Sequence, residues 1–313
     1  MVEVKNLVKS YGNVLALDDI NFNVKQGEVL GFLGPNGAGK STTLNIIAGY
    51  ISPSRGSAIV DGFDILQEPL KARRKIGYLP EFPPLYLDMT VKAYLGFVYD
   101  LKKVKSDDKN KAIDEVCKKV DILDIKNRLI KNLSKGYKQR IGLAGALLGD
   151  PPVLILDEPS VGLDPRQVVE MRKFIRGLGK SHTVILSSHI LSEVQEICSR
   201  VVIINKGKII ADDLTENLID RLNNTKKLLL QIEGEKERVR AILKDVEGVL
   251  KVSLGKKQKE DIYEYSLELE KADNEDVRRN IFFALAKNSM PLLNITGFTS
   301  SNNLEDVFLK LTN

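Results

Sequence analysis

The stretch Gly34-Pro35-Asn36-Gly37-Ala38-Gly39-Lys40-Ser41-Thr42 has the spacing G-x-x-x-x-G-K-[ST] of a phosphate-binding loop. It follows residues 28–33, which are predicted to form a strand, and it runs into residues 41–48, which are predicted to form a helix. In this context backbone N–H groups turn toward phosphates, the lysine reaches the β- and γ-phosphates, and the serine hydroxyl binds Mg²⁺. The alternative is a glycine-rich turn without a ligand. The flanking strand and helix favour a nucleotide-binding loop whose contacts are Asn36, Gly37, Gly39, Lys40, Ser41 and Thr42.

Composition predicts a globular protein with two domains. The chain has 313 residues, of which 43% are hydrophobic and 28% are charged, and its net charge is +5. We expect no membrane span, because no apolar run approaches the roughly 18 residues that a span needs. We expect no secretory signal either, because the first residues lack its apolar core. Cys117 and Cys198 are expected to be reduced and buried. The net charge is modest for this length, so we expect no nucleic-acid partner.

The first predicted domain covers residues 1–214. Short strand patterns before residue 60 predict an antiparallel β subdomain, with Tyr11-Gly12 in a polar turn, and helical periodicity predicts a helical insert at about 83–150. The nearly all-apolar segments 153–156 and 183–186 have the composition of parallel strands that are buried on both faces. Together with the phosphate loop, these patterns predict an α/β P-loop NTPase domain.

The second predicted domain covers residues 215–313. Strand and helix patterns alternate there in the order βαββαβ, followed by a helix at 304–311, which predicts a small α+β domain of the ferredoxin-like, split-βαβ kind. We find no catalytic group of residues in this domain.

Two adjacent acids, Asp157 and Glu158, follow the apolar segment 153–156. Carboxylates at the end of a buried strand are costly to desolvate without a cation. In a P-loop fold, Asp157 is expected to hold Mg²⁺ and Glu158 to act as the general base toward the attacking water. A solvated strand end is the alternative.

The sequence around these acids resembles the ATP-binding-cassette (ABC) ATPases. Leu133-Ser134-Lys135-Gly136-Tyr137-Lys138-Gln139-Arg140 is similar to the signature loop of that family, and the segment from Asp157 to Pro165 is similar to its second phosphate-site motif and D-loop. Ser187-Ser188-His189 is similar to its switch histidine. The resemblance covers about residues 1–212, and the tail resembles the accessory domain of a subgroup that drives ABC-2 type exporters.

The resemblance implies roles for further residues. Tyr11 would stack on adenine, Ser134 and Gly136 would complete the ATP site of a second copy, and His189 would contact the γ-phosphate. Asp164 would lie at the dimer interface. Glu81 stands where the family usually has Gln, and we expect it near Mg²⁺. Lys135 and Tyr137 replace the usual Gly and Gln of the signature.

These observations predict the ATP-hydrolysing subunit of an ABC transporter, with ATP and Mg²⁺ as cofactors. Its expected partners are a separate transmembrane subunit and a second ABC ATPase, in a homodimer or a heterodimer, at the cytoplasmic face of the cell membrane. Residues 82–86 either pack within the insert or line a groove for a helix of the membrane subunit. Export is what the subgroup implies. One alternative is an ABC ATPase that acts on ribosomes or DNA, but such proteins usually carry two cassettes in one chain, a long coiled-coil insert or zinc cysteines, and this sequence has none of these. Another is a P-loop GTPase, which needs Asn-Lys-x-Asp, whereas Asn205-Lys206-Gly207-Lys208 lacks the Asp.

Overall fold

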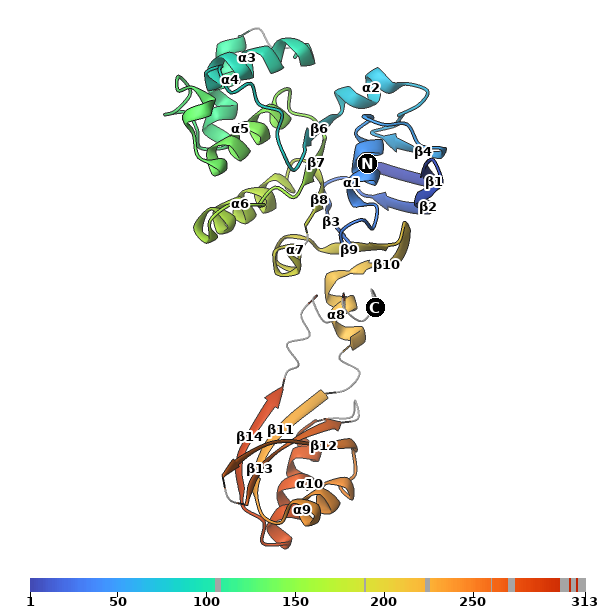
Figure 1. Ribbon diagram of the computed structural model, residues 1–313, viewed down its shortest axis with the longest axis vertical. Coiled ribbons are helices and arrows are strands. Elements are labelled where there is room, and N and C mark those ends of the chain that lie inside the picture. The colour runs from blue at the N-terminus through green and yellow to red at the C-terminus, as the bar shows by residue number, and fades with distance from the viewer. Residues whose placement is uncertain are drawn as a thin grey trace. The chain divides into compact units, whose positions relative to one another are not determined.

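The computed structural model describes residues 1–104, 108–188, 190–222, 226–259, 261–269, 274–298, 304 and 308. The chain forms two compact units, one containing Met1–Thr215 and the other consisting of Glu216–Val307 (Figure 1). Each unit has its own sheets and its own hydrophobic core.

An antiparallel sheet begins the first unit. Its strands are β1 (Val2–Tyr11), β2 (Val14–Val24), β4 (Arg55–Val60) and β5 (Phe63–Asp64), in the order β2-β1-β4-β5. The prediction that Tyr11 lies in the turn is wrong. Tyr11 is the last residue of β1 and pairs with Val14, the first residue of β2. The strands therefore extend up to the turn, which contains only Gly12 and Asn13.

A six-stranded sheet forms the centre of this unit. It contains β3 (Val29–Leu33), β6 (Ile76–Leu79), β7 (Val153–Asp157), β8 (Thr183–Ser187), β9 (Arg200–Asn205) and β10 (Lys208–Leu214), in the order β10-β9-β3-β8-β7-β6. The neighbouring pairs are parallel except for β9 with β10, which form an antiparallel hairpin that turns at Lys206-Gly207. Every residue of β7 and β8 is buried, as the apolar runs predicted.

Helices surround this sheet. Helix α1 (Lys40–Ile47) follows the phosphate loop, and α2 (Pro69–Arg74) precedes β6. The insert contains α3 (Val91–Lys102), α4 (Lys109–Lys119), the short 3₁₀ helix η1 (Ile130–Asn132) and α5 (Lys135–Leu147). Its three α-helices lie together beside β6 and β7 (Figure 1). Helix α6 (Pro165–Leu178) precedes β8 in the sequence, and α7 (Leu191–Ile197) follows it.

The helices start where their capping residues stand. Thr90, Asp108, Ser134 and Asp164 each accept a hydrogen bond from a backbone N–H in the first turn of α3, α4, α5 and α6. The sequence Ser106-Asp107-Asp108 also suits the start of a helix, but Ser106 and Asp107 lie outside the described residues.

The second unit begins with α8 (Thr215–Leu222), of which only Thr215 belongs to the first unit. Its elements are β11 (Lys226–Glu233), α9 (Lys236–Lys244), β12 (Val249–Lys259), β13 (Ile262–Leu269), α10 (Asn274–Lys287) and β14 (Leu292–Phe298). This is the βαββαβ order, and the antiparallel sheet has the strand order β12-β13-β11-β14. Of the helix predicted at 304–311, only residues 304 and 308 lie within the described part.

Candidate active site

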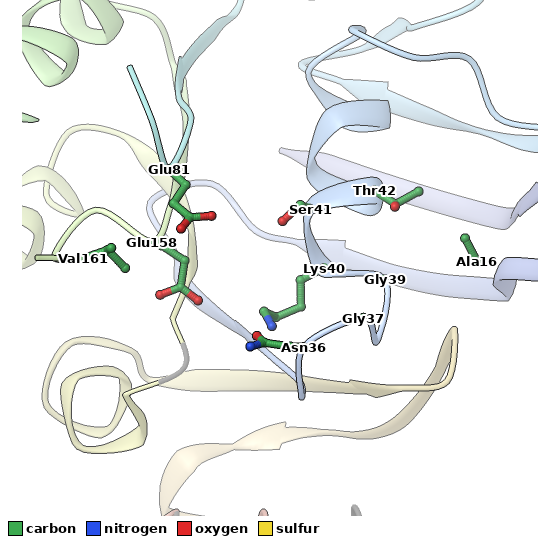
Figure 2. A pocket seen from close by; sticks show the side chains of 10 residues that line it. All are labelled: Ala16, Asn36, Gly37, Gly39, Lys40, Ser41, Thr42, Glu81, Glu158 and Val161. Atoms are coloured by element: carbon green, nitrogen blue, oxygen red, sulfur yellow. The ribbon is translucent and has the colours of Figure 1, made fainter. Parts of the chain in front are cut away.

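A cavity of about 340 Å³ lies beside the loop between β3 and α1. Of the residues that line it, eight were predicted from the sequence: Asn36, Gly37, Gly39, Lys40, Ser41, Thr42, Glu81 and Glu158. Figure 2 shows Glu81 and Glu158 on one side of the cavity, facing Ser41 and Lys40. The site therefore combines the phosphate loop with carboxylates from the ends of two other strands.

Sheet order brings these groups together. Strands β3, β8, β7 and β6 are parallel neighbours, so their carboxyl ends meet at one edge of the sheet. The phosphate loop follows β3, Glu158 follows β7, and Glu81 comes two residues after β6. The order of the strands in the sheet cannot be seen in the local sequence pattern of each segment.

Two glycines shape the phosphate loop. Gly37 has φ +78° and Gly39 has φ +112°, a backbone region that other residues rarely adopt. A Cβ atom at Gly37 would meet open space, whereas one at Gly39 would lie 2.6 Å from Leu17 Cδ2 and 2.9 Å from the backbone oxygen of Ala16. The loop is therefore pressed against β2 at Gly39.

Lys40 is buried, with 7% of its surface exposed. Its ammonium donates to the backbone oxygen of Gly34 at 2.7 Å and to that of Pro35 at 3.3 Å. Burial lowers the pKa of Lys40 below its usual value, and the negative charges of Glu158, Asp157 and Glu81 oppose this shift. The Lys40 ammonium is thus hydrogen-bonded to its own loop and interacts electrostatically with three carboxylates.

Asp157 and Glu158 are held by Ser187 at the end of β8. The Ser187 hydroxyl donates to Asp157 Oδ1 at 2.5 Å, and the Glu158 N–H lies 3.0 Å from Ser187 Oγ and 3.2 Å from the backbone oxygen of Ser187. Glu158 has a left-handed backbone with φ +50°. Its side chain lines the cavity, whereas Asp157 is buried beside it without lining it.

The residues assigned to a partner's site lie elsewhere. Ser134 and Asp164 cap α5 and α6, and a Cβ at Gly136 would lie 2.4 Å from Gln167 Oε1 in the first turn of α6. The start of α5 therefore lies against the first turn of α6, with Gly136 buried there, and we call this place the signature surface (Ser134, Gly136 and Asp164). None of the three residues lines the cavity. Tyr11 is half exposed and also lies outside the cavity lining. The predicted His189 is outside the described residues.

Two cavity residues were missed by the sequence analysis. Val161 belongs to the Asp157–Pro165 motif and could have been found there, because it follows Glu158 by three positions. Ala16 comes from β2 in the antiparallel sheet, and no local signal marks it. Only the packing of one sheet against the loop brings it to the site.

Comparison with known proteins identifies the family. Residues 17–161 match the model of the ABC transporter family. The chain is 38% identical over 241 residues to the bacitracin transport ATP-binding protein of Bacillus licheniformis, covering 76% of this chain and 77% of the relative. It is 31% identical over 313 residues to the linearmycin resistance ATP-binding protein of Bacillus subtilis (strain 168), covering 100% and 98%. The chain belongs to the ABC transporter family.

A solved structure agrees with this assignment. A bacterial ABC cassette, dimeric in a post-hydrolysis state with ADP and phosphate bound, matches the ATPase with a TM-score of 0.63 at 26% identity, covering 68% of this chain and 98% of that one. The protein is thus an ATP-binding and ATP-hydrolysing subunit of an ABC transporter. The predicted family, P-loop fold and ATPase activity are confirmed, and the transporter function is favoured over the ribosome or DNA alternative. None of the helices in the described part of the chain is long and apolar enough to cross a membrane.

Proposed function

We propose that two copies of the ABC ATPase associate head to tail, so that the phosphate loop of one copy and the signature surface of the other enclose each ATP. The observation that supports this is the separation of the two groups within one chain. Lys40, Ser41 and Glu158 line the cavity, whereas Ser134 caps α5 and Gly136 packs against Gln167 of α6. ATP-driven closure of the dimer would perform the mechanical work of transport, and hydrolysis would reset it.

The cavity residues suit ATP with Mg²⁺. Mg²⁺ is usually held by one or two carboxylates together with substrate phosphates, rather than by a cage of protein ligands. Ser41 and Glu81 line the cavity, and Asp157 ends the adjacent strand β7, so these three would hold the ion. Within the described residues, no group of three or more His, Cys, Asp and Glu could hold a metal alone. The bound ion would neutralise phosphate charge during hydrolysis.

Each chain residue then has a distinct task. Lys40 leaves the oxygens of its own loop to contact the β- and γ-phosphates, and Asn36, Gly37, Gly39 and Thr42 present the backbone of the loop. Glu158 takes a proton from the attacking water. Tyr11 stacks on adenine, and His189 contacts the γ-phosphate. Asp164, at the start of α6, lies at the interface between the copies.

We further infer a separate transmembrane subunit as partner, at the cytoplasmic face of the cell membrane, and export as the direction of transport. The aromatic side chains of Phe82 and Tyr86 are 71% and 54% exposed at the start of the insert. The Tyr86 ring packs on Phe97, with the ring centroids 5.4 Å apart. Tyr86 is therefore held in place by the insert while about half of its surface remains exposed. Tyr86→Asp is expected to abolish assembly with the membrane subunit while the ATPase activity of the free protein persists. Intact complexes would contradict this docking site.

We also propose domain limits of 1–214 and 215–313. The hydrophobic core formed by β11 to β14 with α9 and α10 supports an independently folded accessory domain at the C-terminal end.

A mixing experiment tests the shared sites. Lys40→Met damages the phosphate loop and Gly136→Arg damages the signature surface, so each variant alone is expected to be inactive. Mixed together, they form heterodimers with one intact composite site, and ATP hydrolysis should return. The matched control mixes Lys40→Met with Glu158→Gln, which both damage the cavity half, so that neither site is intact. If the first mixture stays as inactive as the second, the head-to-tail arrangement is wrong.

A further inference from the structure

A buried carboxylate lies on α7, outside the cavity. Glu193 is only 3% exposed. The hydroxyl of Ser160 donates to Glu193 Oε2 at 2.5 Å, and Arg172 Nη2 of α6 is 3.6 Å from Glu193 Oε1. Among the described residues, Oε1 has no hydrogen-bond partner. A buried, ionised carboxylate is costly, so these contacts call for an explanation.

Ser160 belongs to the turn that carries Glu158. The backbone N–H of Val161 donates to the oxygen of Glu158 at 3.1 Å, and that of Leu163 donates to the oxygen of Ser160 at 3.2 Å. The turn starts from the left-handed backbone of Glu158, with φ +50°. Such a conformation is strained in a residue other than glycine, and it persists only where the surroundings hold it.

The turn is held from two sides. The N–H of Glu158 is bound by Ser187 at the end of β8, and the side chain of Ser160 is bound by Glu193. Glu193 is in turn placed by Arg172, which also donates to Glu196 Oε2 at 3.0 Å. Helices α6 and α7 thereby fix the turn from which Glu158 and Val161 reach the cavity.

We propose that Glu193 is a positioning residue for ATP hydrolysis, acting through Ser160 on the turn that orients the Glu158 carboxylate. Glu193 does not line the cavity, so it would act only through Ser160. The proposal rests on the proposed role of Glu158 as the general base. It differs from a purely structural ion pair between α6 and α7, which would contribute to stability alone.

Ser160→Ala removes the hydroxyl donor with little change of volume. We expect kcat to fall roughly 10- to 100-fold, because a misplacement of about 1 Å can cost 10² in rate. The KM for ATP should change little, because the Lys40 loop is untouched. Glu193→Gln keeps the shape of the acceptor but loses the charge facing Arg172, and it should lower kcat less than Ser160→Ala does. This second variant also keeps the test available if Ser160→Ala does not fold.

A matched control comes from the antiparallel sheet, where the Ser57 hydroxyl donates to Asp64 Oδ2 at 2.7 Å. Ser57→Ala also removes a serine–carboxylate hydrogen bond, but far along the chain from the turn. We expect its kcat to match that of the wild-type protein. A similar loss of kcat in Ser57→Ala would mean that the rate follows general stability, and would overturn the proposal.

The decisive measurement combines Ser160→Ala with Glu158→Gln. With no base left to orient, Ser160→Ala should not lower the residual rate further, so the two effects should be non-additive. An equal loss of kcat in both backgrounds would show a structural role and overturn the positioning role. If Glu158→Gln alone turns over normally, the proposed base is wrong. If Glu158→Gln is slow while Ser160→Ala has normal kcat, only the role of Glu193 fails.

Discussion

The ammonium of Lys40 lies 2.7 Å from the backbone oxygen of Gly34, so the lysine of the phosphate loop is bound to the first residue of its own loop. Lys40→Met should remove the contact to the phosphates and weaken ATP binding roughly 10- to 100-fold, since hydrogen bonds to charged groups contribute about 1.5–3 kcal/mol. The nucleotide-free protein should stay as stable as the wild type, because burial disfavours the charged lysine. Thermal denaturation with and without ATP measures both effects. A nucleotide-free variant that is much less stable would contradict the second expectation.

Gly39 and Gly37 provide a matched pair in the same loop. Both have positive φ, but only a Cβ at Gly39 would collide, with Leu17 and Ala16. Gly37→Ala should cost about 1–2 kcal/mol through backbone strain alone. Gly39→Ala should cost more, because overpacking adds about 1–3 kcal/mol and shifts the loop away from β2. Urea denaturation and ATP affinity of the two variants test this ranking, and equal losses would contradict it.

Tyr11 tests the placement of adenine. Its side chain is half exposed, which leaves surface for a base, although Lys9 Nζ lies over the ring at 5.0 Å from the centroid. Stacking of a base on an aromatic side chain is worth about 1–3 kcal/mol. Tyr11→Ala should therefore weaken ATP binding roughly 5- to 150-fold, whereas Tyr11→Phe should bind as the wild type does. Equilibrium titration with a fluorescent ATP analogue would decide, and equal affinity of Tyr11→Ala and Tyr11→Phe would exclude stacking at this position.

Lys102 makes the stability of the insert depend on pH. Its ammonium donates to the backbone oxygens of Ala146 and Leu148 at the end of α5, and burial lowers its pKa to about 8. Between about 8 and the usual 10.5, the unfolded chain binds a proton that the folded chain has lost, so this lysine makes stability rise with pH. The rise is at most about 3 kcal/mol.

The variant Lys102→Met lacks this titration. Its destabilisation relative to the wild type should therefore grow from about pH 8 to about pH 10, as measured by urea denaturation at each pH. Lys111→Met removes the same charge from an exposed position on α4 and serves as the control. Parallel curves for Lys102→Met would show that Lys102 stays protonated throughout.

The sequence alone determined the features that arise from neighbouring residues. The phosphate loop was readable because strand, glycine loop, lysine and helix start are contiguous, and their hydrogen bonds are local. The buried strands β7 and β8 were readable from their unbroken apolar runs, and the elements of the second unit from their alternating periods. Motif spacing also pointed to Glu81 and Glu158, which line the cavity with Lys40.

Only the tertiary structure decided how these segments meet. The order β3-β8-β7-β6 places Ser187 against Asp157 and Glu158, and it brings Glu81 opposite Ser41 (Figure 2). Packing of β2 on the loop adds Ala16, and packing of α6 and α7 buries Glu193 against Ser160. The physical reason is that side chains far apart in the sequence are placed by sheet order and by helix packing. Local periodicity reports which face of an element is buried, but it does not specify which other element covers that face.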